Sequence, residues 1–271
     1  MRWKKRDIIK YYKDNAFAYG LWGKNMHYGY WDETTKTQRE ASLRFNEVVA
    51  ETAKVTKDDH VLDAGCGVGG CSIFLATTFG CRVTGITICP NQVERARKNA
   101  KKAGVADLCE FHEMDYEHTR FDDKSFSVVW GFESICYAES KAQFIAESSR
   151  VLKSNGRLVV ADGFASREHY EGKDKKLMQR WLDGWFVNHL NTPGQFANFA
   201  KDSGFSITDY RNVTRQAFKT SKLMLYVSLP FLPLHLLDKI IFFQHPCDAL
   251  YNQYFAMKKG LWEYGIFYAE K

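Results

Sequence analysis

The sequence predicts an α/β fold in which helices cover both faces of a mostly parallel sheet. Residues 61–70 join a short apolar run to an acid and then to a glycine at every second position. Four further strand-like apolar runs follow within about 100 residues, separated by stretches with apolar side chains at helical spacing. Strands that alternate with helices in this rhythm require a parallel sheet. The 271 residues suffice for one large domain with a sizeable core.

The central stretch reads Val-Leu-Asp-Ala-Gly-Cys-Gly-Val-Gly-Gly and predicts a strand, a tight turn and the start of a helix. Gly65 and Gly67 let the backbone turn sharply and approach a ligand, and Gly69 lets the helix pack closely on the strand. The glycines run G-x-G-x-G, whereas a dinucleotide site has G-x-G-x-x-G. Asp63, two residues before the first glycine, is poorly suited to pyrophosphate and well suited to a cation or to hydroxyl and amine donors.

The other elements follow from the same kinds of pattern. Aromatic residues crowd positions 7–31, where they either anchor the N-terminus on the core or form a lid over a site. An amphipathic helix is predicted over 36–53. The later strands and helices are predicted at these positions: a strand and turn within 81–92, a helix through about residue 103, strands at 109–113, 126–133 and 157–162 with a helix over 138–152 between the last two, a helix over 177–190, another from 192, and strands at 205–213 and 262–269.

Composition narrows the class of protein. The net charge is +6, with both signs interspersed, so the short Lys/Arg clusters are interpreted as solvated faces rather than a nucleic-acid patch. Weak attraction to an anionic membrane is the alternative. The seven cysteines show no C-x-x-C pair and no zinc spacing, which predicts reduced thiols and no metal. Basic residues at the N-terminus precede no apolar stretch of signal-peptide length, so a cytoplasmic protein is expected.

The glycine turn with its acid resembles the first motif of the S-adenosylmethionine (SAM)-dependent methyltransferases. At the end of the second strand, Thr87 stands where nucleotide-binding sheets usually have an acid. Its surroundings, Gly-Ile-Thr followed by Pro-Asn-Gln, resemble one subgroup: the cyclopropane-fatty-acid synthases, sterol C-methyltransferases and tocopherol-type methyltransferases. The resemblance is specific for residues 58–163. It implies a class I methyltransferase with a Rossmann-like, seven-stranded sheet whose last strand is antiparallel to its neighbour.

The resemblance also implies SAM as the cofactor and a set of contacts to it. An acid and an aromatic residue just after the third strand, Asp115 and Tyr116, can accept from an exocyclic amine and flank a purine ring. Without the motif, Gln92 would be read as a solvated residue in the first turn of a helix. The residues expected to bind the cofactor are Asp63, Gly65, Cys66, Gly67, Gly69, Thr87, Ile88, Gln92, Asp115, Tyr116 and, from the aromatic segment, Tyr19.

Glu133 is the first candidate for a catalytic residue. It ends a buried strand, at the edge where α/β sheets bind ligands, although a helix N-cap acid is the alternative. His27 and Tyr28 in the aromatic segment are weaker candidates. Aromatic faces can stabilise a carbocation, and a carboxylate can take a proton. We therefore expect methylation of a small, largely hydrophobic acceptor (an isoprenoid, sterol, quinone-like ring or lipid), with carbon as a candidate atom. The alternatives are an N- or O-methyltransferase of a small polar metabolite and a SAM-binding protein without catalysis.

One domain is expected, with a cap and helix over 1–57, a SAM-binding core over 58–163, and lid helices and strands over 164–271. The last part contains an apolar insertion, residues 215–260. Its stretch 223–243 approaches the length of a membrane span, but two prolines and three polar residues interrupt it. Two short helices that cover a pocket or rest on a bilayer surface would explain it, which makes membrane association at this stretch an alternative to a purely cytoplasmic protein. A local core or a subunit contact would explain it equally.

Overall fold

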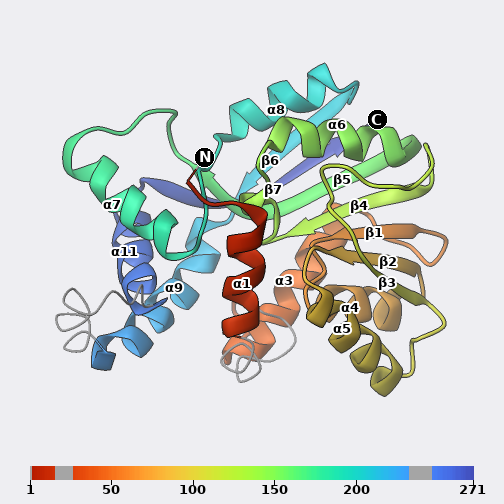
Figure 1. Cartoon of the computed structure of the whole chain (residues 1–271), viewed down its shortest axis with the longest axis horizontal. Coiled ribbons are helices and arrows are strands. Elements are labelled where there is room, and N and C mark those ends of the chain that lie inside the picture. Colours follow the sequence, from red (N-terminus) through yellow and green to blue (C-terminus); the bar gives the residue numbers. More distant parts are fainter. Residues whose placement is uncertain (1, 16–26, 232–245) are drawn as a thin grey trace.

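The computed structural model describes residues 2–15, 27–231 and 246–271. At its centre is a seven-stranded sheet in the order β3-β2-β1-β4-β5-β7-β6 (Figure 1). The first five strands are parallel, and β7 runs antiparallel to both of its neighbours. The predicted fold class is confirmed. The strands are β1 His60–Ala64, β2 Arg82–Thr87, β3 Cys109–Glu113, β4 Phe126–Phe132, β5 Leu152–Ala165, β6 Ile207–Asn212 and β7 Trp262–Glu270.

Helices cover the sheet on both faces. Buried residues of α3, α4, α5, α7, α9 and α11 pack in one core cluster, and those of α6 and α8 pack in a second. The α-helices are α1 Lys5–Asp14, α3 Gln38–Thr52, α4 Gly70–Phe79, α5 Pro90–Ala103, α6 Lys141–Val151, α7 Gly172–Gly184, α8 Pro193–Asp202, α9 Thr214–Ser228 and α11 Pro246–Lys258, and the short 3-10 helices are η1 Ile135–Tyr137 and η2 Leu229–Phe231.

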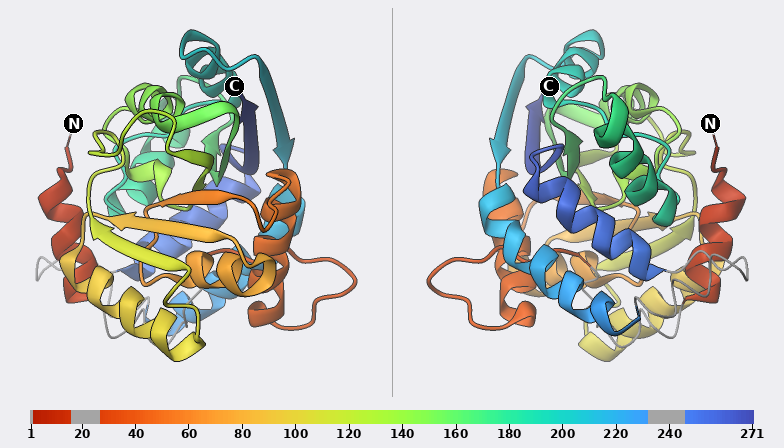
Figure 2. Two further views of the ribbon diagram at one scale, coloured as in Figure 1. Left: turned by 90° about the vertical axis from the view of Figure 1, so that its right-hand side faces the viewer. Right: turned by 90° about the vertical axis from the view of Figure 1, so that its left-hand side faces the viewer.

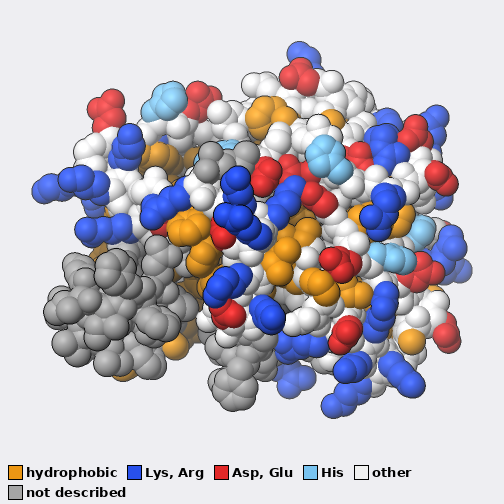
Figure 3. All heavy atoms as spheres, viewed as in Figure 1, with side chains coloured by type: hydrophobic (Ala, Val, Ile, Leu, Met, Phe, Trp, Pro, Cys, Tyr) orange, Lys and Arg blue, Asp and Glu red, His pale blue; other side chains and the backbone are white. Residues whose placement is uncertain are grey.

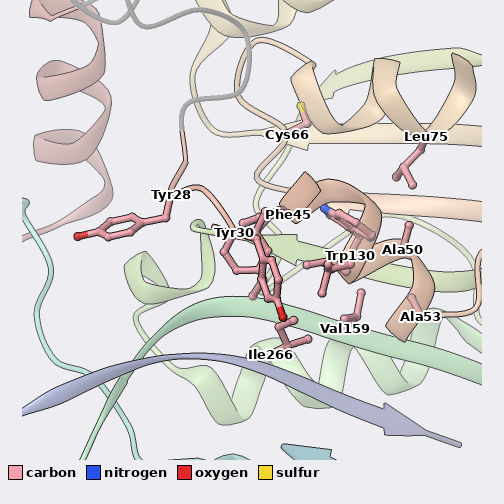
Figure 4. Packing of buried hydrophobic residues seen from close by; sticks show 14 of the residues in the cluster. Tyr28, Tyr30, Phe45, Ala50, Ala53, Cys66, Leu75, Trp130, Val159 and Ile266 are labelled. Atoms are coloured by element: carbon pink, nitrogen blue, oxygen red, sulfur yellow. The ribbon is translucent and has the colours of Figure 1, made fainter. Parts of the chain in front are cut away.

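The two cores meet the sheet through alternating side chains. Trp130 of β4 and Val159 of β5 belong to one core, and the residues adjacent to them in the chain, Val129 and Val160, belong to the other. This alternation follows from the period of two along a strand. Figure 4 shows Phe45 of α3 packed near Trp130 in the first core. The packed sheet thereby fixes the carboxyl ends of its parallel strands. The loops that follow these ends contribute residues to the candidate site.

Local signals account for where two of the predicted helices begin. The Thr37 hydroxyl accepts a hydrogen bond from the Glu40 N–H, and the Glu40 carboxylate accepts one from the Thr37 N–H. Thr192 and Gln195 form the same capping box before α8. Each box satisfies backbone donors that a helix start leaves free. The predictions of a helix over 36–53 and of another from 192 are confirmed.

Two predictions from sequence patterns were wrong in detail, and one helix was missed. The helix predicted over 177–190 is α7, which ends at Gly184, because Phe186 adopts a left-handed backbone (φ +60°) and its apolar neighbours turn toward a cavity. Strand β5 begins at Leu152 rather than 157, with a bulge that lets residues 153–156 leave the regular register with β4. Helix α1 was not predicted as an element at all.

The described part of the insertion forms α9 and α11, and α11 packs between α7 and α9 (Figure 2, right). Residues 232–245 lie outside the described residues, so most of the apolar stretch 223–243 is not seen. None of the described helices is long and apolar enough to cross a membrane.

Candidate active site

A cavity of about 400 Å³ lies at the carboxyl ends of the parallel strands, with α1, α7, α9 and α11 contributing to its walls. This is the edge at which open α/β sheets bind ligands. Most of the residues predicted for the site line it. They are His27, Tyr28, Asp63, Gly65, Cys66, Gly67, Thr87, Ile88, Gln92, Tyr116 and Glu133.

Two of the other predicted residues, Gly69 and Asp115, lie outside this lining. Gly69 (φ +85°) faces Ala96 and Phe111, which a Cβ would approach to 3.1 Å, so it serves the close packing of α4 predicted for it. Asp115 does not line the cavity; its carboxylate pairs with the Lys5 ammonium and accepts the Glu117 N–H at 3.0 Å. Tyr19 lies outside the described residues. Cofactor contacts of all the predicted residues stay predictions.

The glycine turn holds a buried carboxyl group at one end of the cavity. Asp63 is 2% exposed, and one of its oxygens accepts the Ser72 hydroxyl at 2.5 Å. Burial raises the pKa of Asp63 to about 6, against the hydrogen bonds from Ser72, which lower it. A Cβ on Gly65 (φ +89°) would lie 2.3 Å from that of Ser134, so only glycine fits there. The end of the cavity is therefore narrow, rigid and suited to a cationic group.

The second strand adds a polar pair to the same wall. The Thr87 hydroxyl donates to the Gln92 side-chain oxygen at 2.8 Å and accepts the Cys89 N–H at 3.2 Å. The first turn of α5 therefore faces the cavity, and Gln92 is not simply a solvated residue. Across from it, the Tyr116 hydroxyl donates to the Ser134 carbonyl at 2.8 Å. Thr87, Gln92 and Tyr116 therefore all line the cavity, and their contacts to the cofactor stay predictions.

Glu133 directly follows β4 and is held by two donors. Its Oε1 accepts the Tyr28 N–H at 2.6 Å and the Tyr264 hydroxyl at 2.6 Å. Burial raises the pKa of Glu133 to about 8, although both donors favour its ionised form. The residue also has a left-handed backbone (φ +47°), which is uncommon for a residue with a Cβ and clusters at functional sites.

His27 orders the segment that meets Glu133. Its ring stacks on Phe132 with centroids 4.0 Å apart, and its Nδ1 donates to the Tyr28 carbonyl at 2.7 Å. Burial lowers the pKa of His27 to about 4, so the imidazole is neutral near pH 7. Its other nitrogen, Nε2, is buried and lacks a hydrogen-bond partner in the part of the chain that the structure describes. The arrangement suits His27 to positioning Tyr28 better than to moving protons.

The opposite end of the cavity is apolar. The rings of Trp181 and Trp262 stack with centroids 4.4 Å apart, and Tyr28 lies edge-on to Trp262. Tyr28 thereby joins Glu133 to this end. Its apolar side chains come from α7 and the loop after it, from β7, and from the insertion: Trp181, Leu182, Trp185, Val187, Leu190, Met224, Val227, Leu250 and Trp262.

Asp162 and Gln253 are among the polar residues of the cavity that the sequence analysis did not name. Asp162 accepts the Cys136 N–H at 2.9 Å and the Gly163 N–H at 2.7 Å, and burial raises its pKa. It ends a predicted strand, the signal that identified Glu133, and could have been found in the same way. Gln253 of α11 offered no such signal because its place depends on how the insertion packs.

Helix α1 covers one side of the cavity with Ile8, Tyr11 and Tyr12. Figure 1 shows it crossing the front of the molecule, and Figure 3 shows side chains of both charges spread over the same face. The Lys5 ammonium pairs with the carboxylates of Asp115 and Glu117. The described part of the aromatic N-terminal segment is thus both an anchor and a cover, so the two interpretations of it coincide.

Comparisons with known proteins agree with this geometry. A family model described as a methyltransferase domain matches residues 62–160. The 27-O-demethylrifamycin SV methyltransferase of Amycolatopsis mediterranei is 40% identical over 52% of each chain. The 24-methylenesterol C-methyltransferase 3 of Arabidopsis thaliana is 30% identical over 73% of this chain and 55% of its own. The chain thus spans about half the length of these two relatives.

A third relative is covered more fully. The sarcosine/dimethylglycine N-methyltransferase of Halorhodospira halochloris is 28% identical over 75% of this chain and 72% of its own. Among solved structures, a geranyl diphosphate methyltransferase in complex with GPP and sinefungin superposes with a TM-score of 0.79 over 98% of each chain. It is 20% identical, and this likeness shows the fold.

The residues present fit SAM, the cofactor of this family. A buried carboxylate, Asp63, suits the α-amino group, and the turn at Gly65 leaves no room for a Cβ beside the ligand. Thr87 and Gln92 offer polar atoms for hydroxyl groups on the same wall. Strand order, glycine turn, cavity and relatives agree, and the chain belongs to the class I SAM-dependent methyltransferases.

Proposed function

We propose that this chain transfers the methyl group of SAM to a small, largely hydrophobic acceptor, such as an isoprenoid, sterol, quinone-like ring or lipid, with carbon as the favoured atom. The observation that carries the proposal is Glu133, a buried carboxyl group held by Tyr28 and Tyr264 beside a cavity end built from tryptophan and aliphatic side chains. The sterol C-methyltransferase among the relatives supports it.

The chemistry divides between the cofactor and the protein. SAM supplies an electrophilic methyl group on a positively charged sulfur. The apolar end orients the acceptor and excludes water, which an in-line displacement needs more than acid or base. When an alkene carbon takes the methyl group, the electron pair of the double bond forms the new carbon–carbon bond, while the methyl–sulfur bond breaks and leaves its electron pair on sulfur. A neighbouring carbon of the acceptor becomes cationic. The aromatic rings stabilise that cation, and the Glu133 carboxylate takes the proton whose loss restores a double bond.

A second function has specific support. Two carboxyl groups, Glu133 and Asp162, stand with aromatic rings in one cavity, and this combination also suits an amine that becomes an ammonium ion. The sarcosine/dimethylglycine N-methyltransferase among the relatives fits this alternative. A SAM-binding protein without catalysis is less favoured, because Glu133 and its two donors would then have no role.

The deciding experiment incubates the protein with SAM carrying a labelled methyl group and a cell extract, then partitions the products between organic solvent and water. Label in the organic phase, lost with Glu133→Gln, supports the hydrophobic acceptor. Label only in the aqueous phase supports the polar amine or hydroxyl acceptor and overturns the proposal. Bound SAM without any transferred label points to a non-catalytic binder.

Affinity for SAM is expected to depend on pH through Asp63. The pKa of this buried carboxyl group is about 6 in the free protein, and a cationic amino group favours its ionised form. Affinity should therefore be constant near pH 7 and fall roughly tenfold per pH unit below about pH 6. Calorimetry from pH 4.5 to 8 measures this, with proton release on binding below pH 6. The same falling limb in Asp63→Asn would assign the titration to another group.

We also propose that the described start of the 223–243 stretch contacts a bilayer. Tyr226 and Val227 of α9 are 53% and 54% exposed, and Val227 also lines the cavity, so an apolar rim leads into the apolar end. Lys219 and Lys222 precede them on the same helix. The protein should therefore sediment with vesicles that contain anionic phosphatidylglycerol. Tyr226→Ser with Val227→Ser should weaken sedimentation severalfold; unchanged sedimentation would reject this surface.

A further inference from the structure

The buried side-chain amide of one residue joins three walls of the apolar end of the cavity, which we call the acceptor end because it would hold the methyl acceptor. Gln253 of α11 is 6% exposed. Its side-chain nitrogen donates to the Tyr28 hydroxyl, and its side-chain oxygen accepts the Trp185 indole N–H at 2.9 Å. Its backbone carbonyl accepts the Trp262 indole N–H at 3.1 Å. The N-terminal segment, the loop after α7 and strand β7 therefore all meet at this residue.

The first of these contacts leads to the candidate catalytic group. Tyr28 is bound at both of its ends, with the hydroxyl on Gln253 and the backbone N–H on the Glu133 carboxylate. After Tyr28 the segment is fixed independently, because the Gly29 N–H donates to the Thr220 hydroxyl at 3.1 Å and the Tyr30 N–H to the Ala41 carbonyl at 2.8 Å. The Gln253 bond thus helps to orient the Tyr28 side chain relative to its own backbone, together with the ring contacts to Trp262 and Tyr264.

We propose that Gln253 is a positioning residue for methyl transfer: it holds Tyr28 so that the Tyr28 N–H stabilises the ionised form of Glu133. This inference rests on the proposed function for its catalytic meaning, but the contact with Glu133 is testable without any acceptor. It also gives the insertion a role in the reaction centre, although the core fold is complete without it.

Several groups besides Tyr28 act on the titration of Glu133. The Tyr264 hydroxyl of β7 donates to the same oxygen, and the nearby carboxyl group of Asp162 on β5 opposes ionisation. The thiols of Cys71 and Cys136 also face Glu133, but burial raises the pKa of both, so they are neutral near pH 7. Substitution of Gln253 leaves all four in place. A change in the Glu133 titration then reports the Tyr28 contact.

The experiment follows the carboxyl carbons of the full-length protein, labelled with [13C]glutamate, by NMR from pH 5 to 10, with Glu133→Gln to assign the Glu133 signal. In Gln253→Met the side chain keeps its length but loses both hydrogen bonds. The Glu133 midpoint should rise by roughly 0.5 to 1 pH unit, because one of two donors to the ionised form is weakened. Gln179→Met, an exposed residue of α7, is the matched control and should show no shift.

Tyr28→Phe removes the same hydrogen bond by deleting its acceptor. It is a second test in case the Gln253 variant misfolds. It should shift the midpoint in the same direction, and the double variant should shift it no further, since both changes remove one contact. No shift in either variant, or two shifts that add, would overturn the proposal. A failure of the proposed function leaves this titration unaffected and appears instead as absent label transfer. If both ideas hold, the acidic limb of the pH–rate profile moves with the midpoint while the Kd for SAM stays constant.

Discussion

Glu133→Gln is expected to lower kcat for methyl transfer by about 10²- to 10⁴-fold and to leave the Kd for SAM within about twofold. Glutamine has the shape of glutamate, and its oxygen can still accept the Tyr28 N–H and the Tyr264 hydroxyl that hold Glu133. The geometry of the cavity is therefore kept. What is lost, at a pH above the Glu133 pKa of about 8, is the negative charge beside a developing cation and the acceptor for its proton. Single-turnover transfer of labelled methyl to the organic-phase product measures the effect.

The control for this variant is Asp162→Asn, which removes the other carboxylate of the acceptor end and keeps its shape. A similar loss in both variants would mean that the total charge of the cavity matters more than Glu133 itself. A loss below about fivefold in Glu133→Gln would favour an acceptor that needs only proximity, as for a neutral amine, and would remove Glu133 from the catalytic role.

Asp63→Asn is expected to weaken SAM binding by about 100-fold or more while it stabilises the protein without ligand. The loss of affinity follows because a charge-assisted hydrogen bond to the amino group becomes a neutral one in a buried site. The gain in stability follows because burial raises the pKa of Asp63 to about 6 in the folded protein, whereas the ordinary value is 3.8. The folded state binds more protons than the unfolded state between these values, so stability falls as pH rises through this window.

At pH 7 the buried Asp63 carboxylate is ionised and its full destabilising effect is present. Removal of this charge should therefore raise the free energy of unfolding by up to about 3 kcal/mol. Urea unfolding at pH 4 and at pH 7 measures it, because the gain should vanish at the lower pH. The exposed Asp107→Asn is the control for charge alone. Unchanged SAM affinity in Asp63→Asn would reject the assignment of the glycine turn.

The parts of the site that sequence analysis predicted are those fixed by neighbouring residues in the chain. A strand, a turn and a helix follow one another at 61–70, so the place of Asp63 and the glycines was local information. Glu133 could be placed because the carboxyl ends of all parallel strands lie at the same edge of the sheet, and Glu133 follows one of these strands. Asp162 carried the same signal at the next strand and was overlooked.

The acceptor end could not be predicted in this way. Trp185 lies in a stretch whose apolar spacing predicts a helix, yet the left-handed Phe186 ends it and leaves the indole to the cavity. Gln253 reaches Tyr28 across 225 residues through the packing of α11 on α7 and α9. Such contacts depend on tertiary structure, and neither the composition nor the spacing of apolar residues along the sequence predicts them.

The carboxyl groups buried around the cavity also bear on product release. Asp63 and Asp162 line the same cavity, so a ligand's net charge affects its affinity there. On the proposed function, methyl transfer turns a sulfonium ion into a neutral thioether, and the bound ligand loses one positive charge. The same carboxylates that attract the methyl donor then hold its demethylated product less tightly. The protein would thus distinguish spent from fresh cofactor by charge, and product inhibition should weaken as ionic strength falls.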